Sequence, residues 1–301
     1  MIQASEHLSQ QMVETYRDTI CVNDCQILAH YQFEAGQYIL TLESKEIAES
    51  TRPGQFVHLS VSGILSMRRP ISVMSVDKEN GTFELLYKIV GEGTRQLADR
   101  KIGDILSVIG PIGKGFEMTD NKIPLLIGGG VGMPPIIAIA QEIKGNAYYS
   151  PYVVLGSEVP FPFDTIESEL NGFNSSKFHT MPLLEEWGVP CGLASLQNFE
   201  GVYEGYVTGL AREFLDSLSK DDLKNVEIYS CGPNAMLESV SKLAHEYNLP
   251  CQVSLEEFMA CAVGGCAGCV VEVQTENGPA MKRVCVDGPV FEAQSVFNDF
   301  G

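Results

Sequence analysis

Four of the nine cysteines lie close together near the C-terminus, in a spacing suited to metal or redox chemistry. Cys261, Cys266 and Cys269 follow the pattern C-x4-C-x2-C, and Cys285 comes sixteen positions after the third. This is the spacing of plant-type 2Fe–2S clusters. The small residues between the first three let the backbone wrap closely and point its N–H groups at sulfur. Zinc sites normally use paired C-x2-4-C knuckles, whereas the second half here has one cysteine. The spacing therefore predicts that all four bind a 2Fe–2S cluster, with a zinc site or no metal as the alternatives.

A turn between the third and fourth cysteines is flanked by apolar segments. VVEV and MKRVCV lie on either side of Glu276-Asn277-Gly278-Pro279, which is a turn signal. We expect a hairpin there that carries Cys285 back to the other three. The remaining five cysteines are scattered, and an odd total without a secretion signal argues against a disulfide framework.

Two short motifs could hold a phosphate-bearing aromatic cofactor. Arg69-Pro70-Ile71-Ser72 begins an expected strand, where a guanidinium beside a hydroxyl can serve a phosphate and a polar ring atom. Leu86-Tyr87-Lys88 ends another strand and leads into Gly91-Glu92-Gly93-Thr94, a turn before the helix-like segment 95–99. Helix N-termini of this kind suit a pyrophosphate. Taken alone, Arg69 is better explained by a surface ion pair; taken together, the motifs favour a flavin site.

A glycine-rich turn follows the apolar segment 123–130 and opens an expected helix. Its glycines are Gly128, Gly129, Gly130 and Gly132, but no register matches G-x-G-x-x-G, and a tight strand-to-helix connection explains such a turn equally well. Cys231 lies at the C-terminal end of another apolar strand, where ligands of open α/β sheets bind. We expect these residues to border a nicotinamide site, with a buried free cysteine as the alternative for Cys231. The five histidines are dispersed and are expected to be ordinary surface or core residues.

The pattern of strands and helices predicts an α+β chain of several domains. Over 19–119, alternating apolar residues and turn signals predict strands at 37–44, 55–61, 70–76 and 82–90, and hence an antiparallel barrel. Over 120–250, strands at 123–130, 152–157 and 226–233 alternate with helices at 136–143 and 234–247, which predicts a parallel sheet. Segment 164–170 follows the second of these strands in the position of a helix. Residues 1–18 form a polar arm, and 251–301 a cysteine-rich loop and hairpin.

Composition limits the possible partners and locations. Asp and Glu total 39 against 20 Lys and Arg, a net charge of −19, which disfavours nucleic acids and anionic membrane surfaces. Residues 123–140 carry no charge, but four glycines and three prolines would break a membrane helix there. With no basic and apolar leader at the N-terminus, we expect a cytoplasmic protein without a membrane span.

The motifs together resemble the ferredoxin reductase-like flavoproteins, and within them the electron-transfer subunits of class 1B dihydroorotate dehydrogenases. The resemblance runs from about residue 20 to 291 through RRPISV (68–73), LYKIVGEGT (86–94), GPIGKGF (110–116), GGGVGMPP (128–135), CGP (231–233) and EEFMAC…GGCAGC…VCVDGPVF (256–291). It implies an FAD-binding β-barrel domain over 19–119, an NAD-binding α/β domain over 120–250 and a 2Fe–2S module over 251–301. It also implies FAD contacts from Arg69, Pro70, Ile71, Ser72, Leu86, Tyr87, Lys88, Gly93 and Thr94.

The resemblance further implies a partner, the FMN-containing dihydroorotate dehydrogenase catalytic subunit, in a heterotetramer with two copies of each chain. Electrons would pass from that FMN through the cluster and FAD to NAD+, within UMP synthesis. A cluster passes single electrons and NAD+ takes hydride, so a flavin has to join them. The alternatives are the same module serving a hydrogenase, a sulfide dehydrogenase or a ferredoxin:NADP transhydrogenase, and a zinc scaffold without activity. The stretch 171–203 and the arm depart from the family pattern.

Overall fold

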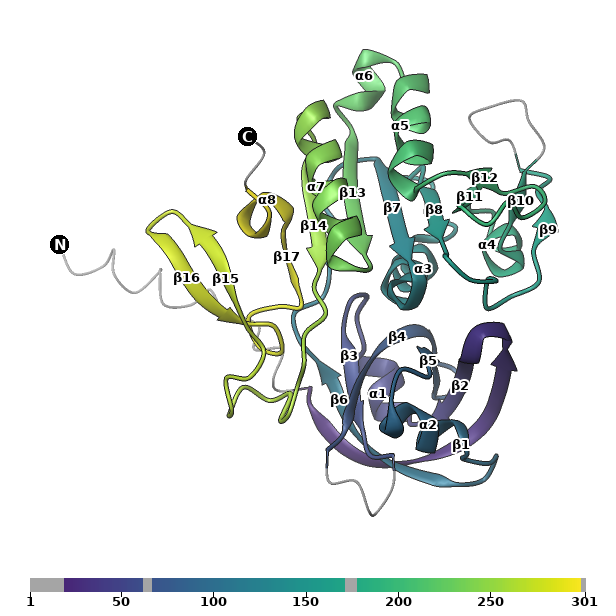
Figure 1. Ribbon diagram of the computed structural model, residues 1–301, viewed down its shortest axis with the longest axis vertical. Coiled ribbons are helices and arrows are strands. Elements are labelled where there is room, and N and C mark those ends of the chain that lie inside the picture. Colours follow the sequence, from purple (N-terminus) through teal and green to yellow (C-terminus); the bar gives the residue numbers. More distant parts are fainter. Residues whose placement is uncertain (1–18, 62–66, 171–177, 299–301) are drawn as a thin grey trace.

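The computed structural model describes residues 19–61, 67–170 and 178–298, so the predicted arm over 1–18 lies outside the described residues. Figure 1 shows a closed barrel below an open sheet that is flanked by helices, with a two-stranded hairpin projecting to one side. The α+β architecture predicted from the sequence is confirmed. Within the described ranges, no helix is long and apolar enough to cross a membrane.

The barrel consists of six antiparallel strands in the order β1-β2-β5-β4-β3-β6. Alternating apolar residues such as Val57, Leu59 and Leu85 fill its interior and are fully buried. This alternation is why the segment folds as strands, since successive side chains of a strand point to opposite faces. The elements are β1 (Cys21–Phe33), η1 (Glu34–Gly36), β2 (Gln37–Glu43), α1 (Lys45–Ser50), β3 (Phe56–Leu59), β4 (Arg69–Asp77), β5 (Thr82–Lys88), α2 (Glu92–Ala98) and β6 (Ile105–Ile112).

The open sheet has seven strands in the order β12-β11-β8-β7-β13-β14-β17, all parallel except β17. Its strands are buried on both faces, which explains their continuous apolar sequences. One face packs on α3 and the other on α5 and α7. The elements are β7 (Ile123–Gly129), η2 (Gly130–Gly132), α3 (Met133–Ile143), β8 (Tyr152–Gly156), α4 (Pro182–Glu186), β11 (Cys191–Ser195), β12 (Tyr203–Glu204), α5 (Val207–Ser217), α6 (Lys220–Leu223), β13 (Val226–Cys231), α7 (Asn234–Tyr247), β14 (Cys251–Ser254), β17 (Val290–Glu292) and α8 (Ala293–Val296).

The expectation of a helix over 164–170 is wrong. The segment contains the short strand β9 (Ile166–Glu167), which pairs with β10 (His179–Thr180). Tertiary hydrogen bonds override its helix-compatible composition, because the Glu185 carboxylate accepts from the Ser168 hydroxyl at 2.8 Å and from the Glu169 backbone at 2.7 Å. The described part of the atypical stretch, 178–203, contains β10, α4 and the sheet strand β11, and β10 pairs with β9 just before the stretch.

The predicted hairpin is confirmed as β15 (Val270–Thr275) and β16 (Gly278–Arg283), joined at Glu276 and Asn277. Residues 255–289 make an excursion from the sheet, because β14 precedes them and β17 pairs with β14 after them. The backbone N–H of Leu255 donates to the carbonyl of Pro289 at 2.9 Å, so the two ends of the excursion meet. The predicted domain boundaries stay predictions, and two strands of the predicted C-terminal module belong to the sheet.

Side-chain hydrogen bonds tie the barrel to the sheet. Gln141 of α3 accepts from the backbone N–H of Val76 and donates to its carbonyl, both at 3.0 Å. Gln37 of β2 donates to the Pro160 carbonyl at 2.7 Å, just beyond β8. These contacts hold the barrel against the carboxyl ends of the parallel strands, where cofactors of α/β proteins bind.

Candidate cluster and cofactor site

The four predicted cluster ligands form two pairs, Cys269 with Cys285 across the hairpin and Cys261 with Cys266 in the loop before it. The sulfurs of Cys269 and Cys285 lie 3.3 Å apart, and each residue is only 3% exposed. On the outer side, the backbone N–H of Cys266 donates to the sulfur of Cys261 at 3.4 Å, and Cys266 is exposed. One pair therefore faces the interior and the other faces solvent.

The loop that carries these cysteines has a backbone shaped around sulfur. Ala262, Gly264 and Ala267 have φ values of 56°, 82° and 51°, a region in which small residues are tolerated best. Burial raises the pKa of the Cys261 thiol, but hydrogen bonds from the Val263 backbone, Cys266 and the Gly265 backbone outweigh it and lower that pKa to about 7. The loop thus favours a thiolate, which is the form that binds metal.

The donor set fits a two-iron cluster better than one ion. Across the residues that the structure describes, no three or more His, Cys, Asp or Glu side chains converge closely enough to hold a single metal ion. Two cysteine pairs are the arrangement in which each iron of a 2Fe–2S cluster takes two protein ligands. Cys285 has a pKa raised to about 12 by burial and by neighbouring Cys269, so metal binding there has to displace a proton.

The predicted flavin residues gather where β4, β5 and the start of α2 meet. The guanidinium of Arg69 lies directly over Gly93, since a methyl group on Gly93 would come within 2.1 Å of its Nε. Thr94 closes the turn before α2, because its Oγ1 accepts from the backbone N–H groups of Val90 and Gly91 at 2.9 and 3.2 Å. Pro70 and Ser72 lie on the same face of β4 and pair with β3.

Leu86 and Tyr87 are the most deeply buried of the predicted flavin side chains. The Tyr87 ring is 3% exposed, stacks on Tyr38 with a centroid separation of 5.3 Å, and its hydroxyl lies 2.8 Å from Nε2 of His30. Leu86 is 2% exposed and packs with Met74 and α3. These two residues can offer a cofactor mainly their backbone, while Lys88 is half-buried at the end of β5. Their role as FAD contacts stays a prediction.

The glycine-rich turn packs tightly against the end of β13. A methyl group on Gly132 would lie 2.5 Å from the backbone of Cys231, and one on Gly129 would lie 2.4 Å from Sδ of Met236. Gly128 is similarly confined, with Leu155 3.1 Å from such a methyl group. Gly130 differs, because it has a φ of 55° and no atom of the described residues lies within 4 Å of an added methyl group. A tight connection accounts for three of the four glycines, and Gly130 alone faces open space.

Cys231 lies at the carboxyl edge of the sheet, beside this turn. It is 1% exposed and pairs with Ser254 at the end of β14. Burial, and then the charge of Glu256, raises the pKa of its thiol, so Cys231 stays a neutral thiol. Its place near a nicotinamide stays a prediction.

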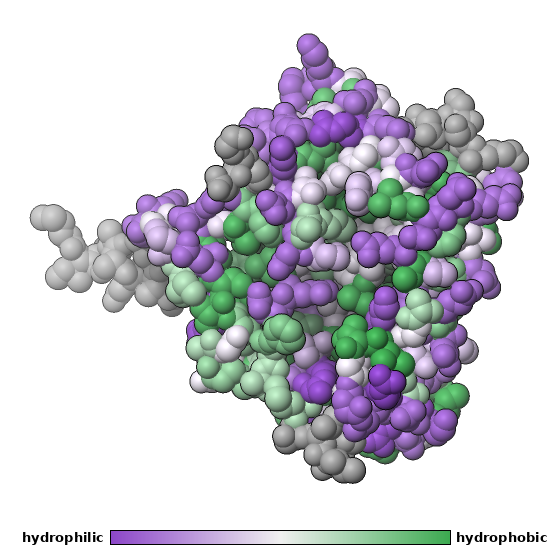
Figure 2. Space-filling view, viewed as in Figure 1, coloured by the Kyte–Doolittle hydropathy of each residue, from purple (hydrophilic) through white to green (hydrophobic). Residues whose placement is uncertain are grey.

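The segment that leads from β14 to the cluster loop presents one aromatic ring to solvent. Phe258 is 94% exposed, although Leu255 and Met259 on either side of it are 6% and 8% exposed. Figure 2 shows hydrophobic surface gathered over the loops of this C-terminal segment, whereas the upper part of this face is mostly hydrophilic. Such a patch is typical of a surface that another molecule covers.

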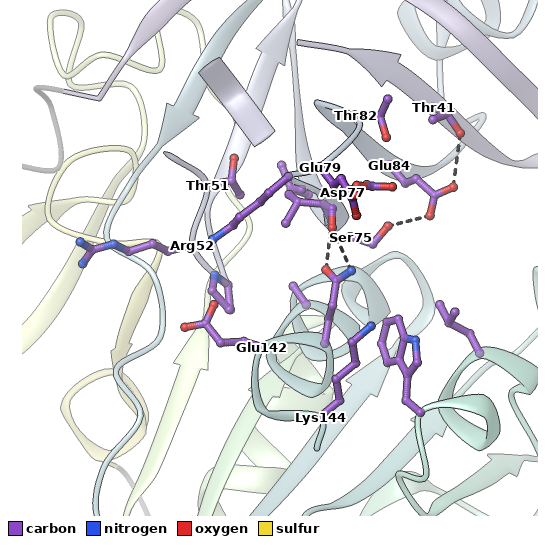
Figure 3. Close-up of a pocket in the computed structure, with 18 residues that line it drawn as sticks. Thr41, Thr51, Arg52, Ser75, Asp77, Glu79, Thr82, Glu84, Glu142 and Lys144 are labelled. Carbon is purple, nitrogen blue, oxygen red and sulfur yellow. Dashed lines mark hydrogen bonds between the residues drawn. The ribbon is translucent and has the colours of Figure 1, made fainter. Parts of the chain in front are cut away.

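A cleft of about 800 Å³ between the barrel and α3 lies away from these residues (Figure 3). In it the Glu84 carboxylate accepts hydrogen bonds from Ser75 at 2.6 Å and Thr41 at 3.3 Å. On the opposite wall Lys144 covers the ring of Trp187 at 4.3 Å. None of the predicted cluster, flavin or nicotinamide residues lines this cleft, so the cleft is separate from the predicted site.

Sequence reasoning missed two residues beside the site. His58, paired with Pro70 in the barrel, is 1% exposed and is therefore a core histidine, which the sequence pattern allowed but did not single out. Arg283 precedes Cys285 by two positions and contacts the cluster loop through Gly264. The basic pair Lys282-Arg283 directly before Val284 and Cys285 was the sequence signal that could have identified Arg283. No local sequence pattern identifies His58.

The barrel, the parallel sheet and the four-cysteine loop define a ferredoxin reductase-like flavoprotein with a 2Fe–2S segment. Residues 32–116 match the oxidoreductase FAD-binding domain family. Residues 256–297 match the iron–sulfur cluster binding domain of dihydroorotate dehydrogenase B. A solved structure described as an NADH-dependent reduced ferredoxin-NADP oxidoreductase has a TM-score of 0.74 at 24% identity, covering 91% of this chain and 90% of that one. This likeness concerns the fold.

The similarity to curated relatives identifies the family more specifically than the likeness in fold. One from Caldanaerobacter subterraneus subsp. tengcongensis is 34% identical over 270 residues, 90% of this chain and 96% of the relative. Another from Listeria welshimeri is 37% identical over 259 residues, 84% of this chain and 90% of the relative. Both are described as dihydroorotate dehydrogenase B (NAD(+)), electron transfer subunit. The chain belongs to this family of electron transfer subunits, with FAD, an iron–sulfur cluster and NAD+ as its cofactors and co-substrate.

Proposed function

We propose that this chain passes electrons from an FMN-containing dihydroorotate dehydrogenase catalytic subunit, through a 2Fe–2S cluster and FAD, to NAD+ in pyrimidine (UMP) synthesis. The observation that carries the proposal is the pairing of the cysteines, with one pair at the surface and one pair buried. When bound, the flavin supplies the exchange between one-electron and two-electron transfer.

The chain's own residues contribute position and insulation. Cys261 and Cys266 present the cluster to the surface, where a partner's electrons arrive. Cys269 and Cys285 would hold its inner side, since both belong to the large hydrophobic core cluster that also contains Ala262 and Val284. Arg69 and the turn at Gly93 lie where a pyrophosphate would sit, and a cation beside backbone N–H groups suits that charge. Burial of Cys231 keeps a neutral group at the sheet edge.

The partner is proposed to dock on the hydrophobic surface over the cluster loops, in an assembly of two copies of each subunit. The acidic surface, with a net charge of −19, calls for a docking partner that is basic or apolar rather than acidic. We place the assembly in the cytoplasm, where reduced thiols persist.

The test is an anaerobic NADH titration of the purified chain, followed in the visible spectrum. We expect flavin and cluster bands that NADH bleaches together. The catalytic subunit and dihydroorotate are then added to the oxidised chain with NAD+, and NADH formation is measured. A chain that binds neither chromophore after supply of FAD, iron and sulfide would refute the proposal.

The fold likeness to a ferredoxin-NADP oxidoreductase supports a second candidate, the same module serving another electron donor. Reduced ferredoxin replaces dihydroorotate and its dehydrogenase in the same assay. If ferredoxin drives NADH formation and the dihydroorotate system does not, the second candidate replaces the first.

A further inference from the structure

Cys285 lies inside a short loop that one arginine and one aspartate close. The backbone N–H of Arg283 donates to Oδ2 of Asp287 at 2.7 Å, and the backbone N–H of Asp287 donates to the carbonyl of Arg283 at 2.7 Å. Their side chains meet as well, with Nε of Arg283 3.5 Å from Oδ2 of Asp287. The pair therefore brackets one buried cluster ligand on both sides.

The same arginine reaches the loop that carries the outer ligands. Its Nη1 donates to the carbonyl of Gly264 at 3.2 Å, between Cys261 and Cys266. A methyl group on Gly264 would lie 3.4 Å from this nitrogen and 2.5 Å from Val286, so only glycine admits the contact without a shift. Arg283 thus connects the segments that hold the inner and outer cysteine pairs, and it places a positive charge against the loop that encloses the cluster.

A charge at this place acts on electron transfer because the cluster changes its own charge. Four thiolates and two sulfides around two ferric ions make a doubly negative group, and one added electron makes it triply negative without forming or breaking a bond. A neighbouring cation stabilises the reduced form more than the oxidised form, and a neighbouring anion does the opposite. Both side chains are partly shielded from solvent, at 39% and 31% exposure, so screening weakens the effect without removing it.

We propose that Arg283 and Asp287 are positioning residues that set the reduction potential of the cluster, Arg283 raising it and Asp287 lowering it. The proposal rests on the proposed function only in requiring that the chain holds the cluster. It assigns the pair a role in how readily the chain accepts an electron from its donor.

Redox titration of the purified chain, followed by electron paramagnetic resonance at low ionic strength, tests this. Arg283→Met is expected to lower the midpoint potential by ~59 mV, which corresponds to a tenfold change in the equilibrium constant of one-electron reduction. Arg283→Lys keeps the charge and is expected to shift it less. Asp287→Asn keeps an acceptor oxygen for the Arg283 backbone and is expected to raise the potential.

Lys282→Met is the matched control, because it removes the same charge from the adjacent position, whose side chain points to the opposite face of β16. Equal shifts in Lys282→Met and Arg283→Met would overturn the proposal. A potential that shifts in the same direction in Asp287→Asn and Arg283→Met would also overturn it. So would an unchanged potential combined with faster loss of the cluster to a chelator, which is the result expected if the two residues only hold the loop in place. If Arg283→Met holds no cluster, the lysine and asparagine variants decide. A wild-type chain that holds no cluster refutes the proposed function instead.

Discussion

The four predicted ligand thiols differ in exposure and environment although their spacing alone makes them equivalent. Cys266 is exposed, Cys261 is half-buried with a pKa of about 7, and Cys269 and Cys285 are buried. This gradient gives the cluster an outer side that a donor can approach and an inner side turned toward the protein. A single ligand change therefore acts on the cluster far more than on the fold.

Cys266→Ser is expected to reduce cluster-bound iron at least about tenfold, because a hydroxyl is a poor substitute for a thiolate and even outer-shell changes cost this much. Iron content and the visible cluster bands measure it. Cys21→Ser is the control, since Cys21 donates to the Gly110 carbonyl at 3.1 Å and a serine hydroxyl can make the same bond. Retention of iron in both variants would contradict the ligand assignment.

His58 makes stability depend on pH in the acid range. It is 1% exposed, and neither ring nitrogen has a hydrogen-bond partner among the residues that the structure describes. Burial lowers the pKa of His58 from 6.5 to about 4. The nearby backbone of Arg68 opposes this shift, although its position relative to the ring does not meet the geometry of a hydrogen bond. The unfolded chain then binds a proton that the folded chain does not, so stability present near neutral pH is lost as the pH falls from 6.5 toward 4.

Between about pH 7 and about pH 5 this residue is expected to cost the FAD-free chain about 2 kcal/mol of unfolding free energy. His58→Phe is expected to remove that loss and to be neutral or stabilising at neutral pH, because it deletes two unsatisfied polar atoms. Urea unfolding at both pH values measures it. The same pH dependence in the two proteins would show that His58 is not the group responsible.

At the scale of elements, the sequence predicted best where local pattern and final contacts agree. The helix expected over 234–247 is α7 with the same bounds, since its apolar positions recur at helical spacing and Pro233 precedes it. The cysteine loop was predicted from spacing alone, because metal ligation imposes that spacing. The helix predicted over 164–170 was wrong because hydrogen bonds of this segment go to Glu185, which is far along the chain.

Other features depend on tertiary contacts that no local pattern encodes. The pairing of β17 with β14 unites residues separated by the whole cluster loop. The contact between Arg283 and Gly264 likewise appears only after the hairpin has folded. The predicted flavin motifs lie on β4 and β5, but the inward direction of the Tyr87 side chain follows from the register of the barrel rather than from the motif.

The glycine-rich turn provides a prediction at this scale. Gly132→Ala is expected to destabilise the chain by about 2–3 kcal/mol, because the added methyl group meets the backbone of Cys231 and cannot be relieved by side-chain rotation. Gly130→Ala is expected to cost only about 1 kcal/mol, from its positive φ, since space is free there. Chemical denaturation gives both values, and a reversed order would refute this packing of the turn.

At the scale of the whole molecule, the site requires the barrel and the sheet to keep one arrangement. Gln141 is suited to this because one side chain satisfies both backbone groups of Val76. The predicted flavin residues lie on the barrel and the glycine-rich turn lies on the sheet, so any opening at this junction separates them.

Gln141→Ala is therefore expected to lower the unfolding free energy by about 1–3 kcal/mol, the usual range for two hydrogen bonds. It is also expected to slow NADH-driven flavin reduction while leaving iron content unchanged. Gln197→Ala, at an exposed position after β11, is the control and is expected to change stability by less than about 0.5 kcal/mol. Calorimetry and stopped-flow spectroscopy make the comparison, and equal effects of the two changes would contradict the role of the junction.

The meeting of Leu255 with Pro289 has a consequence for how such proteins arise and how they can be re-engineered. The cluster-bearing excursion leaves and re-enters the sheet between neighbouring antiparallel strands. A cassette attached in this way can be gained or lost in one genetic event, since a tight turn replaces it without moving either strand. The shortened chain would keep the barrel and the sheet, and with them the flavin that exchanges single electrons for pairs, but it would lose the relay that receives a donor's electrons at the surface. One splice point thus separates a plain nicotinamide–flavin reductase from one that carries its own one-electron relay.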